Sequence, residues 1–511
     1  MKSPHPIRPF VFFAPLSLLV VGLAISLVDV GAFIDYNRAA VSWILDRFGW
    51  MFSWSTFLFV LLLVFVYFSP LSKRKIGGEK AVPILNRWRW FAITLCTTIA
   101  TGILFWGTAE PVYYLQSPPA GSGDDAGVFA MSTLFMHWTI TPYAIYTVAG
   151  LSFALAYYNQ QQAFSLSAML HPLLGERAKR WATLIDAVCL FALVAGMSAS
   201  LGAGILSLSG GIFNLTADGE SPVGSSTEVI NFWTSAGGYA LLGGGIVLAF
   251  LLSAASGLQR GIRTLSNYNA IGFIVLAILV LAFGPIAKLF SLAGDGLLEF
   301  GSHFLSRSTN IANPLPTDWQ HDWTIFYWAN WFAWAPVSAL FLGRLSVGYR
   351  VRDFIHVNWI LPALFGGLWM VIFGGSAIEL DAASGGALQA NLSENGPESI
   401  IYQLFDTLPA TELVTGLFVL LVFLSYVTAA DSNISAMGAI SVKGINPERP
   451  EAPLRIRLVW GVVIGTVSWV MISFAGIDGI RLISVVGGFP AMILISLVGV
   501  GLLIHTLRAR P

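Results

Sequence analysis

The chain has 511 residues, of which 56% are hydrophobic, 13% aromatic and only 11% charged, and its mean hydropathy is +0.74. Soluble globular proteins carry about 25% charged residues, so this chain has too few charges to cover a water-facing surface of its size. Lys plus Arg and Asp plus Glu both number 27, which leaves no basic surplus for nucleic-acid phosphates. The composition therefore predicts a polytopic membrane protein and excludes a nucleic-acid partner.

Cysteine and histidine usage excludes several kinds of site. The two cysteines, Cys96 and Cys189, lie in separate apolar runs, which excludes a disulfide scaffold and a cysteine-based metal site. The histidines show no metal-ligand spacing, and no cluster of catalytic groups suggests a membrane enzyme. We therefore expect neither a metal nor a cofactor. A channel would need a selectivity-filter motif, which the sequence lacks.

The predicted elements follow from the apolar runs, because a membrane-crossing helix needs roughly 20 mostly apolar residues. Twelve such runs occur, at 10–30, 51–69, 89–115, 127–157, 181–210, 239–257, 266–287, 324–343, 354–375, 412–431, 456–475 and 484–506. The predicted fold class is therefore an all-α polytopic membrane protein with twelve transmembrane helices. Two shorter stretches, 297–305 and 397–407, are predicted interfacial helices.

The basic residues predict the orientation of these helices, because cytoplasmic segments of membrane proteins are enriched in Lys and Arg. With a cytoplasmic N-terminus, most of the 27 basic residues fall in cytoplasmic segments. The predicted outside segments contain only Arg38, Arg47, Lys288, Arg307 and Arg481. We therefore predict that both termini are cytoplasmic, in a multi-pass protein of a bacterial-type inner membrane.

The third predicted helix is unusually polar for a lipid-facing segment. It contains several threonines together with Gly102, Gly107, Glu110 and Pro111. Its small residues form either a helix-packing face or a site where hydroxyls satisfy backbone groups freed by Gly and Pro. Glu110 must face protein or water, because a carboxylate inside a membrane is costly. A structural hydrogen bond is the favoured role of Glu110, and a proton relay is the alternative.

Aromatic residues are concentrated in two of the predicted helices. The eighth carries three tryptophans spaced three residues apart, Trp328, Trp331 and Trp334. The fourth carries Trp138, Tyr143 and Tyr146. The run in the eighth helix fits an interfacial aromatic belt, because it lies near the start of the helix. Alternatively, aromatic walls from the two helices enclose a quaternary ammonium group by cation–π attraction.

Two charged residues lie at the ends of predicted helices. Arg263 precedes the seventh helix, where the positive-inside rule alone accounts for it. Asp431 lies at the predicted end of the tenth helix, where the helix dipole disfavours a carboxylate. We therefore expect Asp431 to be paired.

Several motifs resemble those of the betaine/choline/carnitine transporter family, and the resemblance extends over nearly the whole chain. The motifs are Phe105-Trp-Gly-Thr-Ala-Glu-Pro111, His137-Trp138 with Pro142 and Tyr146, Ser200-Leu-Gly202, Trp323-Thr-Ile-Phe-Tyr-Trp-Ala329, Trp334-Ala-Pro336, Arg344-x-Ser346-x-Gly348 followed by Arg352-x-Phe354, and Thr428-x-x-Asp431-Ser432. Together these motifs are highly specific.

The resemblance implies a LeuT-like fold, in which two N-terminal helices precede two five-helix repeats of opposite topology. Such repeats place the substrate near the membrane midplane. The chain then divides into residues 1–88 with helices 1 and 2, 89–292 as the first repeat, 293–323 as an extracellular segment, 324–506 as the second repeat, and 507–511 as a short cytoplasmic tail. The family also suggests a homotrimer.

The resemblance implies alternating-access transport of a betaine-like quaternary ammonium or related zwitterionic solute. The family's aromatic box falls on Trp138, Tyr143, Tyr146 and Trp331, and its permeation path falls on or near Phe105, Tyr113 and Trp334. Tyr143 and Asn330 both stand where the sodium-coupled betaine carrier has tryptophan. Because the amide of Asn330 offers hydrogen bonds but no π face, the choice among betaine, carnitine, choline and less methylated zwitterions stays open.

The sodium sites implied by the resemblance are altered in this chain. Leu193 and Met197 replace two threonines, and Thr428-Ala429 replaces a Thr-Ser pair. Arg263 falls where the sodium-independent carnitine/butyrobetaine exchanger has an arginine in place of a sodium ion, and a guanidinium can supply that positive charge.

We therefore expect sodium-independent antiport or proton-coupled transport. Glu110, Asp431 and Thr428 are the candidate coupling residues. Sodium-coupled symport of a compatible solute is the alternative within the class, and a channel is the alternative of another class.

Overall fold

The computed structural model describes residues 6–98, 102–123, 125–216, 232–256, 259–311, 315–444 and 452–509. Every regular element in these residues is a helix. Nine helical segments are long and apolar enough to cross a membrane, or ten if a pair bent by 104° counts as one span. The predicted all-α polytopic architecture is thus confirmed, whereas the number of twelve helices stays a prediction.

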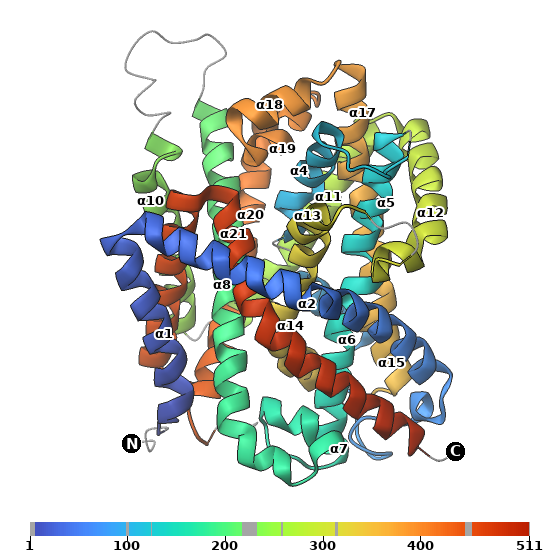
Figure 1. The fold of residues 1–511 in the computed structure, drawn as a ribbon, viewed down its shortest axis with the longest axis vertical. Coiled ribbons are helices and arrows are strands. Elements are labelled where there is room, and N and C mark those ends of the chain that lie inside the picture. The colour runs from blue at the N-terminus through green and yellow to red at the C-terminus, as the bar shows by residue number, and fades with distance from the viewer. Residues whose placement is uncertain are drawn as a thin grey trace.

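The chain begins with a short and a very long helix. α1 spans Pro9–Val28 and α2 spans Val30–Phe68. Asp29 separates them because its extended backbone ends α1, while its carboxylate accepts a hydrogen bond from the N–H of Ala32 and caps α2. α2 begins well before the predicted start at residue 51, and it crosses the face of the molecule obliquely (Figure 1).

The fourth predicted helix is interrupted, and the third is described in two parts. The two parts of the third are α3 (Arg87–Thr98) and α4 (Gly102–Gln116), and residues 99–101 lie outside the described residues. α5 (Ala126–Trp138) and α6 (Ile140–Ala154) meet at Thr139, whose backbone is not helical. Pro142 has no N–H to bond the carbonyl of Trp138, so the helical ladder is weakened at this point.

Four further helices complete the first half, and the last two of them meet at a bend of 104°. They are α8 (Arg177–Thr216), α10 (Ala236–Ser256), α11 (Gln259–Phe283) and α12 (Ile286–Thr309). α12 covers the predicted interfacial helix 297–305 but begins directly after Pro285. The predicted boundary at residue 292 therefore falls inside α12.

The second half begins with helices of 4 to 20 residues, and wider helical turns join some of them. They are α13 (Thr317–Gln320), α14 (Phe326–Leu345), α15 (Val351–Ile355), α16 (Leu361–Trp369), α17 (Gly375–Ala383), α18 (Ala387–Asn395) and α19 (Ile400–Phe405). The wider turns cover His321–Ile325, His356–Ile360 and Met370–Gly374. Each inserts an extra residue per turn and rotates the following side chains.

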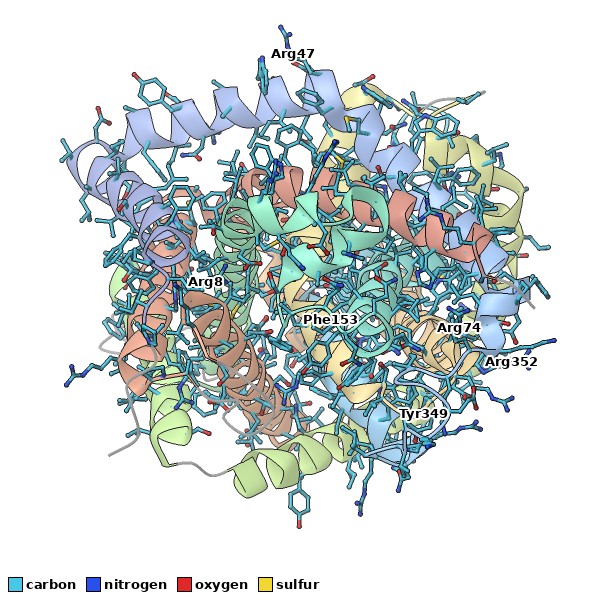
Figure 2. All side chains as sticks on the ribbon, turned by 90° about the horizontal axis from the view of Figure 1, so that it is seen from below. Arg8, Arg47, Arg74, Phe153, Tyr349 and Arg352 are labelled. Atoms are coloured by element: carbon cyan, nitrogen blue, oxygen red, sulfur yellow. The ribbon has the colours of Figure 1, made fainter. Side chains whose placement is uncertain are left out.

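Two long helices end the chain. α20 spans Thr411–Ser441, and α21 spans Leu454–Leu507. α21 holds both of the last predicted helices, which lie on either side of Gly476, where φ is +53° and favours glycine. α1 begins and α21 ends at the same lower end of the molecule (Figure 1). Figure 2 views this end, with Arg8 on one side and Arg74 and Arg352 together on the other.

Small residues let α21 approach its neighbours closely. A Cβ atom on Gly487 would overlap the Cβ atom of Ala195 in α8, and one on Gly488 would overlap the carbonyl oxygen of Ala329 in α14. Close backbone contacts of this kind stabilise helix pairs in membranes, where lipid offers no hydrophobic driving force between helices. The contact at Gly488 fixes α14 two residues before Trp331.

We expect Gly488→Ala to lower the stability of the protein by about 1–3 kcal/mol, because the added methyl group overpacks the α14–α21 contact. The measurement is thermal unfolding in detergent. Gly245→Ala in α10 is the control, because a Cβ atom at Gly245 meets nothing within 4 Å. Equal melting temperatures for the two variants would contradict the packing described here.

Candidate functional site

Four aromatic rings meet in the interior around Trp331 of α14. Ring centroids of Trp138, Tyr143 and Tyr146 lie 5.7, 5.3 and 5.0 Å from that of Trp331. All four side chains are buried. We call these four residues the aromatic cluster. The structure thereby brings together the four rings that the family resemblance selects, and in this conformation they touch one another.

The local sequence explains how the rings converge. The break at Thr139 separates Trp138 from α6, on which Tyr143 and Tyr146 are three residues apart and share one face. Two glycines make room for Trp138. A Cβ atom on Gly102 would lie 3.1 Å from the indole ring, and one on Gly366 would overlap the carbonyl oxygen of Trp138.

Glu110 organises the hydrogen bonds beside this cluster. Its Oε2 atom accepts hydrogen bonds from Trp138 Nε1 at 2.6 Å and from the Tyr327 hydroxyl at 2.5 Å. Its Oε1 atom accepts one from the Tyr114 hydroxyl at 2.7 Å and lies 2.8 Å from His137 Nδ1. The carboxylate is fully buried, and these four partners come from α4, α5 and α14. This geometry agrees with a structural role for Glu110.

His137 is held from two further sides. Its Nε2 atom lies 3.2 Å from Thr324 Oγ1, and its ring stacks on Tyr327 with the centroids 4.5 Å apart. Because Nδ1 lies against the Glu110 carboxylate, Nδ1 carries a proton. His137 therefore takes part in the network as a donor.

Phe105 and Tyr113 of the predicted permeation path, and Asn330 beside the aromatic cluster, each contact different neighbours. Phe105 is buried against Trp106, with ring centroids 5.0 Å apart. Tyr113 is half-buried and packs on Trp323 at 5.1 Å. Asn330 accepts a hydrogen bond from Ser484 of α21 at 3.4 Å, whereas its neighbour Trp331 faces α6. The amide of Asn330 and the aromatic cluster therefore contact different helices.

Two positions where the family resemblance predicts altered sodium ligands meet at a small cavity next to Trp334. Met197 of α8 and Ala429 of α20 both line this cavity, whose volume is about 20 Å³. Such a volume holds about one water molecule. Ser200 and Tyr426 are its polar residues, and Leu193 is buried nearby in α8. In the described part of the chain, no three His, Cys, Asp or Glu side chains form a group that could hold a metal ion.

The structure shows where the candidate coupling residues Thr428 and Asp431 lie, but it does not describe the side chain of Arg263. The Thr428 hydroxyl bonds to the carbonyl of Leu424 at 2.7 Å. Asp431 lies inside α20, because this helix continues to Ser441. The prediction that Asp431 sits at the end of its helix is therefore wrong, and the dipole argument for its pairing does not apply. Arg263 belongs to α11, but its side chain lies outside the described residues.

Sequence reasoning missed the role of Arg481. Its guanidinium carbon lies 4.3 Å from the ring centroid of Trp323 and 5.9 Å from those of Tyr113 and Phe326. Asp478 lies one turn earlier, with an oxygen 3.6 Å from Arg481 Nη1. This stacking places a cation over the aromatic side chain of a predicted path residue, Tyr113. The sequence offered one indication of Arg481: it is among the few basic residues in the predicted outside segments.

Glu398 is a second residue that sequence reasoning missed. It lies in the short turn Pro397–Ser399 before α19, and a Cβ atom on Gly210 of α8 would lie 2.8 Å from its carbonyl oxygen. Burial raises the pKa of Glu398 from 4.5 to about 7. Its carboxyl is close enough to Tyr113 to interact electrostatically. A titratable group near neutral pH thus lies beside the predicted path.

We expect Tyr327→Phe to lower stability by about 1.5–3 kcal/mol, because it removes a hydrogen bond to the buried Glu110 carboxylate. Tyr143→Phe is the matched control, because the Tyr143 hydroxyl has no hydrogen-bond partner among the described residues. The measurement is thermal unfolding in detergent. A Tyr143→Phe variant that loses as much stability as Tyr327→Phe would refute the assigned network.

Comparison with known proteins shows the family of the chain. A family profile described as BCCT, betaine/carnitine/choline family transporter, matches residues 10–510. The ectoine/hydroxyectoine transporter of Virgibacillus pantothenticus is 27% identical over 459 residues, which cover 88% of this chain and 87% of that protein. The glycine betaine transporter OpuD of Bacillus subtilis is 27% identical over 494 residues, covering 95% and 92%. The high-affinity choline transport protein of Escherichia coli K12 is 28% identical over 511 residues, covering 98% and 72%.

Proposed function

The chain belongs to the betaine/carnitine/choline family of transporters, and we propose that it moves a betaine-like quaternary ammonium or zwitterionic solute by alternating access. Its relatives are transporters and not enzymes. The observation that carries the substrate class is the convergence of four buried rings on Trp331. Choline, already a candidate substrate, also appears in the name of a relative, and another relative's name adds ectoine to the candidates.

The aromatic cluster supports recognition of a desolvated cation. A quaternary ammonium over the face of Trp or Tyr, within about 6 Å of the ring centroid, gains about 2 kcal/mol or more when desolvated. The rings touch one another in this conformation, so a trimethylammonium group needs them to separate. We propose that Trp331 turns away from α6 to admit the substrate and that the rings close around it during transport.

The finer architecture is part of the proposal. We propose twelve membrane-spanning helices, with residues 89–292 and 324–506 forming two inverted repeats. Counting α21 as two spans divided at Gly476, and α3 with α4 as one span, supports this number. The common end of α1 and α21 supports placing both termini in the cytoplasm, in a bacterial-type inner membrane (Figure 1). We also propose a homotrimer, which rests on the family alone.

We propose that transport is sodium-independent. Met197 and Ala429 offer no side-chain oxygen to the small cavity beside Trp334. α8 also passes Met197 without a break that would free backbone carbonyls to coordinate a cation. By the family resemblance, the guanidinium of Arg263 would supply the missing positive charge. Antiport and proton coupling both fit this arrangement, and sodium symport is the alternative.

The residues differ in their suitability for proton coupling. Glu110 is engaged by four partners, so a proton cycle there would disrupt the packing of three helices. Asp431 and Thr428 remain candidates within α20. Glu398 adds a candidate because its pKa of about 7 lets it exchange a proton near neutral pH.

We expect Trp331→Ala to abolish saturable uptake of labelled betaine, carnitine and choline into proteoliposomes, because it removes the ring that the other three contact. Trp50→Ala is the control, since Trp50 is 62% exposed on α2. Counterflow of unlabelled substrate in the wild type separates a carrier from a channel. Wild-type uptake rates in Trp331→Ala would refute the assignment of the aromatic cluster as the substrate site.

We expect wild-type uptake to be equal in sodium and potassium buffers. Arg263→Ala should lower the uptake rate at least about tenfold, because it removes one charge-assisted interaction. Added sodium should restore part of the uptake. Arg260→Ala, three residues earlier on α11, controls for the loss of a basic residue from the same segment. A strict sodium requirement of the wild type would contradict the proposed coupling.

A further inference from the structure

A pocket that shares no residue with the aromatic cluster opens near the end of α21. Its volume is about 560 Å³. Its lining residues come from four segments: Arg74, Gln160, the stretch 171–175, and His505, Arg508 and Ala509. Arg74 follows the short helix Pro70–Lys73, and residues 171–175 comprise α7 (His171–Leu174) and Gly175. Three stretches distant in sequence, at Arg74, 160–175 and 505–509, therefore build one concave surface.

The pocket is rich in hydrogen-bond donors. Arg74 and Arg508 are exposed, and among residues 6–509 that the structure describes neither guanidinium has a carboxylate within 4.0 Å. Gln160 joins the two histidines. Its Nε2 atom donates to His505 Nδ1 at 2.8 Å, and its Oε1 atom accepts from His171 Nδ1 at 3.2 Å. The remaining ring nitrogen of neutral His505, Nε2, then carries the proton and is a further donor.

The backbone around the pocket is held in place. The N–H of Arg74 donates to the carbonyl of Leu71 at 3.0 Å, and the carbonyl of Arg74 accepts from Val351 at 3.0 Å. The N–H of Gln160 donates to the carbonyl of Leu155 at 3.0 Å. Gly175 closes α7 with a positive φ of 55° and a 2.8 Å bond to the carbonyl of His171. A ligand would therefore meet a preformed site.

The acidic residue next to the pocket is engaged elsewhere. Glu176 is exposed, and its Oε2 atom lies 2.7 Å from Lys179 Nζ, while its Oε1 atom lies 3.7 Å from His171 Nε2. The hydrogen bond and charge of Lys179 lower the pKa of Glu176. Since Lys179 already neutralises Glu176, the charge of the two arginines is left for an external anion.

We infer that this pocket binds a phosphate group, supplied by inorganic phosphate or by the headgroup of an anionic phospholipid. Guanidinium groups bind phosphate oxygens through paired, charge-assisted hydrogen bonds. Two guanidinium groups with an imidazole N–H match the several acceptor oxygens of one phosphate. Exposed apolar side chains stand close in sequence to both arginines, Phe68 before Arg74 and Leu507 before Arg508.

The test measures binding to the intact, detergent-purified protein in two arms. In the first, inorganic phosphate is titrated at constant ionic strength with chloride as the comparison anion, and the melting temperature reports binding to the folded state. In the second, native mass spectrometry counts phosphatidylglycerol and phosphatidylcholine retained by the protein. Binding in the first arm identifies a free phosphate ligand. Binding of phosphatidylglycerol alone identifies the lipid headgroup.

Three variants make this test specific for the pocket. We expect Arg74→Gln and Arg508→Gln each to weaken binding at least about tenfold, since each removes one charge-assisted contact. Arg177→Gln is the matched control, because Arg177 is an exposed basic residue at the start of α8 that does not line the pocket. Unchanged melting temperatures of all three variants in chloride show that they fold. Binding that is insensitive to both pocket variants, or no binding in either arm, overturns the inference.

Discussion

The buried carboxylate of Glu110 is the constraint on which the interior of this transporter depends. An unpaired carboxylate inside a membrane protein is strongly unfavourable, so its hydrogen-bond partners must remain in place. Those partners belong to α4, α5 and α14, and removing any one leaves a buried carboxylate oxygen with one partner in place of two. Packing alone would allow these helices to slide, whereas directional bonds to one carboxylate fix their relative positions.

The same network positions the aromatic cluster. Trp138 donates its indole N–H to Glu110 and presents its ring to Trp331. Tyr327 bonds to the same carboxylate from one helical turn before Trp331 on α14. On the far side, Gly488 of α21 admits the backbone of α14 at Ala329. Polar bonds on one side and close backbone contact on the other therefore hold the helix that carries Trp331.

Two other regions carry charged groups of different chemistry. In one, Arg481 stacks on Trp323 and Tyr113, and the Glu398 carboxyl has a pKa near 7. In the other, Arg74 and Arg508 line a pocket with two histidines joined by Gln160. The first lies beside Tyr113, a residue of the proposed permeation path. The second shares no residue with the aromatic cluster and is the proposed phosphate site.

The sequence by itself determined the membrane class, most helix positions and the residues of the aromatic cluster, because apolar runs and family motifs are local patterns. Only the tertiary structure decided that four donors share Glu110, that Asn330 faces α21 while Trp331 faces α6, and that α20 extends past Asp431. The position of Arg481 over Trp323 and the assembly of the pocket with Arg74 and Arg508 could not be predicted either, since each joins residues far apart in the chain. Helix rotation and packing set such contacts, and no local pattern encodes them.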